Sequence, residues 1–429
     1  MATTTTTSAF HKEIEYVSPT RQRVMGVVFL LIGFAIWYLF ARPLEPGLTT
    51  KFGMTPGGVK AVIPDLVLPT LATILLLAIT CGILGIIQLV RPGGFKRYTN
   101  LVLGLTFALF VLAFLTYAAA GKSFNLAGLL NSTLLKAVPL TLGAMAGILC
   151  ERAGVVNIAI EGMMLSASMT ACVAASITGN LWFGMLVGVL TGGFYGVVHG
   201  VLSIKYNVNQ IISGTAINIF SMGITSYISA KFLQRIQELN DSGTFRPIEI
   251  PGLSKIPVIG PILFDNNIYV YAMFFFLIVL HIGLFYTRWG LRMRSVGEHP
   301  KAADTLGINV FRTRYMAVLL GAMMAGFAGS YFTLGSVGRF DEVMTAGRGF
   351  ISLAAMLFGN WMPFGAFGAG LLFGFADALA SKLAILGVKI PSQFLLMTPY
   401  VITMIVLAGV VGRSQMPAAD GTPYEKEST

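Results

Sequence analysis

Stretches of about 20 consecutive apolar residues recur along this 429-residue chain, and they constrain its fold more than any other feature. A helix of that length crosses a hydrocarbon core about 30 Å thick. Backbone polar groups in lipid must be hydrogen-bonded within the segment or in a closed barrel. The stretches are continuously apolar rather than alternating, which excludes barrel strands. The sequence therefore predicts an all-α, polytopic transmembrane helical bundle in the cell membrane.

Composition supports lipid as the main solvent of this chain. Only 11% of the residues are charged, against about 25% in a typical soluble domain. The net charge of +11 comes from basic residues at the ends of the apolar stretches, so we expect contact with the bilayer surface and no nucleic acid. The three cysteines lie in apolar stretches without metal-ligand spacing, and we expect neither a metal nor a cofactor.

We predict about 10–12 membrane segments, some of them broken or short. Two candidates, Val138–Cys150 and Phe350–Phe358, are too short to cross a bilayer alone. The remaining candidates are Val24–Phe40, Leu66–Val90, Leu101–Ala120, Ile158–Ile177, Leu181–Ile204, Gln210–Ala230, Tyr269–Tyr286, Tyr315–Leu334, Phe364–Ala380 and Phe394–Val411.

Lysine and arginine in the short loops set the orientation, because such residues are retained in the cytoplasm. They place the basic loop 289–314 in the cytoplasm and the loop Lys231–Ile268 outside. We divide the chain into a disordered N-terminal tail at 1–20, N-terminal transmembrane spans at 21–120, a main transmembrane domain at 121–412 that contains this cytoplasmic loop, and a C-terminal tail at 413–429.

Small residues repeat every four positions in three of the predicted helices. The rows are Gly184, Gly188, Gly192, Gly196 and Gly200; Ala366, Gly370, Gly374 and Ala378; and Ala322, Gly326 and Ser330. Small residues let helices approach closely in lipid, where the hydrophobic effect does not hold them together. We interpret the rows as helix-packing faces.

Two polar segments interrupt the apolar pattern and are candidates for a solute pathway. The first, residues 150–164, carries Asn157 and Glu161 beyond Gly154, which permits a break between helices. The second, residues 207–218, contains Asn209, Gln210, Ser213 and Asn218, of which Gln210 and Asn218 share one side of a helix. Their amides can bind sugar hydroxyls or a base edge, and they can equally hydrogen-bond a neighbouring span.

The cytoplasmic segment 292–314 predicts a short docking helix. Pro300 suits the first helical position, and Gly307 can end a two-turn helix at Leu306. Ala302, Ala303 and Leu306 would form a small apolar face. A helix of this length is unstable alone, so we expect it to dock on a protein partner.

No phosphate-binding loop of the GxxxxGK[ST] type occurs, and neither HExxH nor GxSxG is present. The chain is therefore not expected to be an enzyme or to hydrolyse ATP by that route. An ion-coupled secondary transporter of a small polar solute remains the alternative.

Five ordered motifs, ERAGVVNIAIEGMM, VNQIISGTAINIF, SVGEHPKAADTLGINV, GRGFISLAAMLFGNW and FGFADAL, resemble the permease subunits of ABC importers for simple sugars and nucleosides, within the ribose and branched-chain amino-acid permease family. The similarity spans about residues 130–412. It implies a second permease subunit (homologous or identical), two cytoplasmic ATP-binding subunits and an extracytoplasmic solute-binding protein or lipoprotein. It also implies that nucleosides or simple sugars are the solutes.

The resemblance also implies roles for individual residues. The family's ATPase-docking loop maps to Gly297, Glu298, Ala302, Ala303 and Gly307, in agreement with the docking helix from Pro300 to Leu306. Broken segments around Asn157, Asn209 and Asn218 would lie near the solute path. Family members often carry Glu where this chain has Gln210, so no ionic role is expected at that position.

Overall fold

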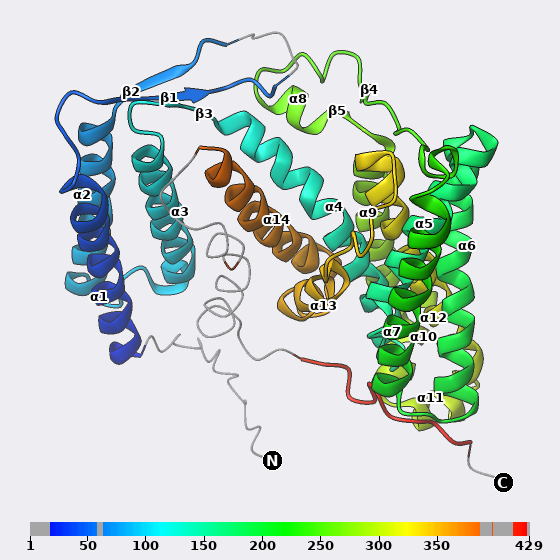
Figure 1. Ribbon diagram of the computed structural model, residues 1–429. Helices are drawn as coiled ribbons and strands as arrows, with labels where there is room; N and C mark the ends of the chain where they lie inside the picture. The colour runs from blue at the N-terminus through cyan, green and yellow to red at the C-terminus, as the bar shows by residue number, and fades with distance from the viewer. Residues whose placement is uncertain (1–17, 58–62, 387–396, 398–414, 427–429) are drawn as a thin grey trace, which may run out of the picture. The chain divides into compact units, whose positions relative to one another are not determined.

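The computed structural model describes residues 18–57, 63–386, 397 and 415–426 (Figure 1). These residues form two compact units. Unit 1 comprises the chain up to Gly53 and Asp65–Phe124, and unit 2 comprises Met54–Pro64 and the chain from Asn125 onwards. The tail expected at 1–20 lies almost entirely outside the described residues, as does most of the span expected at Phe394–Val411.

Unit 1 contains three long helices. They are α1 (Pro19–Ile36, continued by the π-helical turn η1, Trp37–Ala41), α2 (Thr70–Val90) and α3 (Thr99–Ala118, preceded by η2, Lys96–Tyr98). Glycines bring α1 and α2 close together, because a Cβ on Gly33 would lie 2.9 Å from the Ala78 carbonyl oxygen. The two helices thus pack backbone to backbone, as expected in lipid.

A small sheet is formed by the connection between α1 and α2 and by the segment after α3, in the order β2 (Leu66–Pro69), β1 (Thr49–Gly53), β3 (Ser123–Asn125). Strands β1 and β2 are antiparallel, with Thr50 opposite Leu68. The Thr50 hydroxyl lies 2.9 Å from the Thr70 hydroxyl and donates to the Thr116 carbonyl at 3.0 Å, which joins the sheet to α2 and α3. Our expected span start at Leu66 is therefore wrong, since residues 66–69 form a strand.

Unit 2 is a larger helical bundle. Its long helices are α4 (Leu126–Glu151), α5 (Ile160–Thr178), α6 (Leu181–Gly200, continued by η3, Val201–Lys205), α7 (Gln210–Ile228, continued by η4, Ser229–Leu233), α9 (Ile268–Tyr286), α12 (Val310–Phe332, continued by η6, Thr333–Val337) and α14 (Pro363–Ile385). The short elements are η5 (Gln237–Asn240), α8 (Ile259–Leu263), α10 (Arg288–Glu298), α11 (Pro300–Thr305), α13 (Arg348–Phe358) and the antiparallel pair β4 (Ile248–Glu249) and β5 (Asp265–Asn266).

Across the described part of the chain, ten helices are long and apolar enough to cross a membrane. This confirms the polytopic helical fold. One prediction is wrong: Val138–Cys150 is the second half of the 26-residue α4, which crosses at full length. Lys136 and Pro139 interrupt the hydropathy of α4 without ending the helix. The short segment predicted at Phe350–Phe358 corresponds to the 11-residue α13.

The small-residue rows pack helices together as predicted. A Cβ on Gly188 would lie 3.0 Å from the Ser330 side chain, and one on Gly192 would lie 2.7 Å from Gly326. Gly374 of α14 similarly approaches Thr133 of α4, whose carbonyl oxygen would lie 2.7 Å from an added Cβ. Helices α4 and α12 are the most buried long helices of unit 2, and the remaining helices surround them.

Candidate functional site

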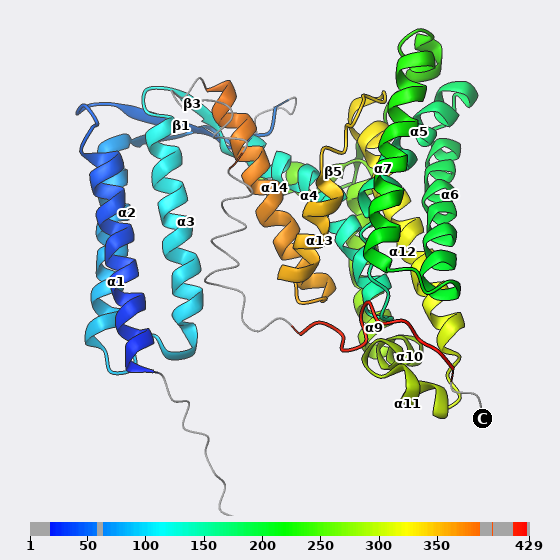
Figure 2. The ribbon, with the colours of Figure 1, turned by 60° about the horizontal axis from the view of Figure 1, so that its bottom comes forward.

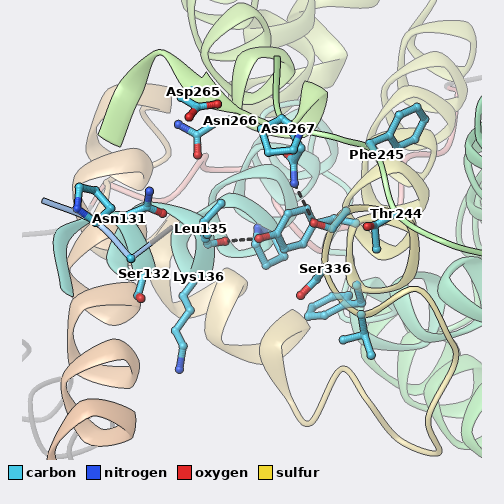
Figure 3. Close-up of a pocket in the computed structure, with 18 of the residues that line it drawn as sticks. Asn131, Ser132, Leu135, Lys136, Thr244, Phe245, Asp265, Asn266, Asn267 and Ser336 are labelled. Carbon is cyan, nitrogen blue, oxygen red and sulfur yellow. Dashed lines mark hydrogen bonds between the residues drawn. The ribbon is translucent and has the colours of Figure 1, made fainter. Parts of the chain in front are cut away.

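A cavity of about 920 Å³ opens at the end of unit 2 that carries the loop 231–268 (Figure 3). That end is extracytoplasmic by the distribution of basic residues. The cavity is lined by Pro56, Gly57, Asn131, Ser132, Leu135, Lys136, Pro139, Thr244, Phe245, Pro247, Pro261, Asp265, Asn266, Asn267, Tyr331, Phe332, Gly335, Ser336, Val337, Asp341, Met344 and Arg348. Amides, hydroxyls and aromatic rings therefore share one chamber.

The aromatic wall of the cavity is held rigidly. The Tyr331 hydroxyl donates to the Leu135 carbonyl at 2.8 Å, and Tyr331 packs edge-on against Phe332 with ring centroids 6.1 Å apart. The Asn267 amide donates to the Gly335 carbonyl at 2.7 Å, which ties the start of α9 to η6 (Figure 3). These bonds fix the position of the wall.

A group of three charged side chains lies at the inner part of this chamber. Asp377 of α14 accepts an ion pair from Lys136 at 2.9 Å and a longer one from Arg348 at 3.4 Å. Lys136 also donates to the Ser381 hydroxyl at 2.7 Å. Lys136 and Arg348 line the cavity, so the group joins α4, α13 and α14 at its floor. Sequence reasoning missed it because Lys136 and Asp377 are 241 residues apart.

Glu161, a predicted pathway residue, binds the start of the half-helix α13. Its carboxylate accepts from the Thr345 hydroxyl at 2.6 Å and from the backbone N–H groups of Gly347 at 2.9 Å and Gly349 at 2.6 Å. A carboxylate at a helix N-terminus satisfies unpaired N–H groups and complements the helix dipole. Glu161 thus binds the backbone on both sides of Arg348, which lines the cavity, although Glu161 itself does not.

The backbone break predicted at Gly154 is present between α4 and α5, where Gly154 has φ +82°. Side chains of α7 hold this connection. Gln210 accepts from the Val156 N–H at 2.7 Å. Asn218 accepts from the Gly162 N–H at 2.7 Å and donates to the Ile158 carbonyl at 2.8 Å.

The other predicted pathway residues bind neighbouring groups of the protein. Asn157 is fully buried and accepts from the Ala159 N–H at 3.1 Å. Asn209 begins α7 and accepts from the Ile211 N–H at 2.9 Å. Ser213 lies 3.0 Å from His199, whose other ring nitrogen lies 3.0 Å from the Val156 carbonyl. None of the six predicted pathway residues lines the cavity of Figure 3.

The cytoplasmic loop contains the short helix predicted from the sequence. Helix α11 begins at Pro300 and ends at Thr305, one residue before the predicted end, with Gly307 at φ +79° just beyond it. Gly297 of α10 packs so closely on the Arg152 carbonyl that any side chain would clash with it. Glu298 accepts from the Ala418 N–H at 3.2 Å.

The apolar face predicted for this helix is divided in the structure. Leu306 is 81% exposed and Ala302 is exposed, but Ala303 is 1% exposed. Ala303 packs against Val296, Val310 and Tyr424 inside unit 2. The expectation of one continuous docking face is therefore wrong, because the helix uses Ala303 to bind its own chain.

Comparison with protein families gives a match over residues 129–412 to the family described as branched-chain amino acid transport system / permease component. No solved structure matches the chain. The matched range covers more than half of the sequence and includes all the residues of the cavity except those of the loop at Pro56 and Gly57.

Curated relatives are permease subunits. The chain is 38% identical to the guanosine ABC transporter permease protein NupQ of Bacillus subtilis, over 69% of this chain and 95% of the relative. It is 38% identical to the nucleoside ABC transporter permease protein NupC of Lactococcus lactis, over 68% of this chain and 95% of the relative. A putative glucose ABC transporter permease protein of Haloferax volcanii is 35% identical over 59% of this chain and 77% of the relative.

These matches agree with the ten helices that are long and apolar enough to cross a membrane. They support a multi-pass subunit of the cell membrane that is not itself an enzyme. The chain belongs to the branched-chain amino acid transport system permease family and is a permease subunit of an ABC importer.

Proposed function

We propose that this permease imports nucleosides and that the cavity of unit 2 is the outer part of their path. The observation that carries the proposal is the combination of aromatic rings and amides in one chamber. Nucleobases stack on aromatic rings, and amide side chains both donate to and accept from base edges and ribose hydroxyls. The 38% identity to guanosine and nucleoside permeases supports the same solute class.

The charges around the cavity also favour a neutral solute. Lys136 and Arg348 are balanced by Asp265 and Asp341 among the lining residues. Asp377, which pairs with both cations, and Arg339, which pairs with Asp341, add one charge of each sign. A chamber without excess charge gives little attraction to an anion or a cation, whereas uncharged polar solutes are bound by hydrogen bonds and stacking.

Import is driven by ATP hydrolysis on two separate cytoplasmic subunits, and a second permease subunit completes the pathway. An extracytoplasmic binding protein or lipoprotein delivers the solute. Family membership supports this set of partners. The exposed residues of the cytoplasmic loop, Ala302, Leu306 and Gly307, supply the contact with an ATP-binding subunit, and the half-buried Pro300 begins the helix that presents them. The predicted pathway residues have a structural role, because they stabilise the break between α4 and α5 and the start of α13.

Uptake of radiolabelled guanosine by the complete complex in vesicles tests the proposal. We expect unlabelled nucleosides to compete and glucose or leucine not to compete. Ser336→Trp, which fills the cavity, should lower uptake about tenfold or more, since the solute loses its path. Glu342→Trp, an exposed change in the same loop, is the control. If glucose competes and nucleosides do not, the transported solute is a simple sugar. Normal uptake by Ser336→Trp would show that the cavity is not part of the solute path.

A further inference from the structure

The last described segment of the chain, residues 415–426, runs across the cytoplasmic end of unit 2 (red in Figure 2). We call it the C-terminal strap. It lies beyond residue 412, where the family match ends. Its partners come from α10, α12, the turn after α13 and the turn between α6 and α7.

One end of the strap is bound to the docking loop. The Ala419 N–H donates to the Gly297 carbonyl at 2.9 Å, and the Ala418 N–H donates to the Glu298 carboxylate at 3.2 Å. Tyr424 is buried against Ala303 of α11, and its ring centroid lies 5.4 Å from that of Phe311. Arg314 of α12 donates to the Thr422 carbonyl at 2.9 Å. A movement of α10 and α11 would therefore displace the strap.

The other end of the strap is bound to the turn after α13. The Gln415 N–H donates to the Asn360 side-chain oxygen at 2.8 Å. Trp361, the residue after Asn360, donates from its ring N–H to the Glu151 carboxylate at 2.6 Å. Its backbone carbonyl accepts from the Arg152 side chain at 3.2 Å. The strap and the end of α4 thus both bind the turn at the cytoplasmic end of α13.

Helix α13 connects this turn to the cavity floor. Its 11 residues extend about 16 Å at the usual rise per residue. Arg348 at its first position lines the cavity and reaches Asp377. Glu161 fixes the same end through three hydrogen bonds. A continuous series of contacts therefore runs from α11 through the strap and Asn360 to Arg348.

We propose that the C-terminal strap is a coupling element that carries displacement of the docking loop to α13 and thereby to the cavity floor. The inference rests on the proposed ATP-driven import, but it does not depend on which solute is carried. Asn360 is its positioning residue, because its side chain joins the strap to α13 without touching the solute chamber.

Thiol labelling at the cavity tests this proposal without a solute. Ser336→Cys places a reactive group in the cavity, whereas Cys81, Cys150 and Cys172 are buried. In the complete complex we expect trapping of nucleotide on the ATP-binding subunits to change the labelling rate of this position. Asn360→Gly should reduce that change about fivefold, as expected for loss of one hydrogen bond that couples two parts.

The choice of glycine preserves the backbone, since Asn360 has φ +53°. Asn360→Asp keeps the acceptor oxygen and should restore the nucleotide-dependent change. An equal response in Asn360→Gly and the parent would overturn the proposal. Loss of the ATP-binding subunits from purified Asn360→Gly complex would also overturn it, because the strap would then act in docking. If guanosine is not imported but the labelling results hold, only the solute assignment fails.

Discussion

Two acidic side chains inside apolar helices of this permease, Asp377 and Glu161, are bound by specific partners. Asp377 is held by Lys136 and Arg348, and Glu161 is held by the N-terminus of α13. An ion at membrane depth is costly unless it is paired or hydrogen-bonded. These residues therefore join helices that are distant in the sequence, and they do so at the inner end of the solute chamber.

Replacing Glu161 tests its role at the start of α13. Glu161→Gln removes one acceptor and turns an amide N–H₂ toward backbone donors, so we expect a loss of about 1–3 kcal/mol in stability. Nucleoside uptake should also fall, because Arg348 is no longer fixed. The thermal unfolding midpoint and uptake rate measure the two effects. Glu342→Gln, an exposed change in the preceding loop, should leave both unaltered, and an unaltered Glu161→Gln variant would contradict the assignment.

The raised pKa of Asp420, a residue of the strap, makes the stability of the folded protein depend on pH. Burial raises the pKa of Asp420 to about 7, and nearby Arg314 offsets only part of that effect. The unfolded chain has a pKa of about 3.9 at an aspartate. Between these values the folded protein binds the proton more tightly than the unfolded chain, so the contribution of Asp420 to stability is greatest at low pH and is lost as the pH rises through 7.

We therefore expect the thermal unfolding midpoint of the permease to fall between pH 4 and pH 7 by more than that of Asp420→Asn. The asparagine cannot ionise, so its variant lacks this part of the dependence. The difference between the two unfolding curves at each pH reports Asp420 together with its neighbour Glu151, with which it interacts. Parallel curves would show that the Asp420 carboxyl is not buried when the strap is in place.

At the scale of elements, the sequence predicted most of the membrane helices, because an apolar stretch of the right length is a strong local signal. The docking helix was also recognisable, from Pro300 and Gly307 at its two ends. The first half of α4 was missed, since Lys136 reduces its hydropathy and its partner Asp377 is known only from the fold. The strand at Leu66–Pro69 was missed for a similar reason, because an apolar strand continues directly into α2.

The solute chamber was the least predictable part of the molecule. Its lining comes from connections and helix ends that contain few unusual residues, such as Thr244, Asn267 and Ser336. Sequence reasoning instead chose polar residues within helices, and the structure shows that Gln210 and Asn218 bind the break between α4 and α5. Polar side chains in lipid first satisfy neighbouring backbone groups, so their presence alone does not indicate a ligand.

An exposed and a buried side chain in and beside helix α11 allow its roles in docking and in folding to be tested separately. Leu306 is 81% exposed and Ala303 is 1% exposed. We expect Leu306→Asp to reduce copurification of the ATP-binding subunits about tenfold while the unfolding midpoint stays constant, because an exposed apolar anchor often dominates binding. Ala303→Arg should instead lower the unfolding midpoint, since a charge would enter a packed site.

The control for α11 is Leu253→Asp, which makes the same change at an exposed leucine of the extracytoplasmic loop. It should leave copurification unaltered. If Leu306→Asp retains its ATP-binding subunits as fully as this control, the exposed side of α11 is not the docking surface.

At the scale of the whole molecule, unit 2 contains both the cavity of Figure 3 and the loop that carries α11, and it includes the whole family match at residues 129–412. Unit 1 is a separate three-helix element held by its own glycine contacts and sheet. Under the proposed function, the site of solute entry and the site of energy input lie at opposite ends of this one helical bundle, with α13 and the strap between them.

ATP-dependent uptake of guanosine by purified components in sealed vesicles tests the account most directly. The permease complex with its ATP-binding subunits and solute-binding protein should concentrate guanosine only when ATP is supplied to the cytoplasmic side. Omission of the ATP-binding subunits should abolish accumulation under imposed proton or sodium gradients. Concentrative uptake by the permease alone under such a gradient would contradict the account and identify an ion-coupled transporter.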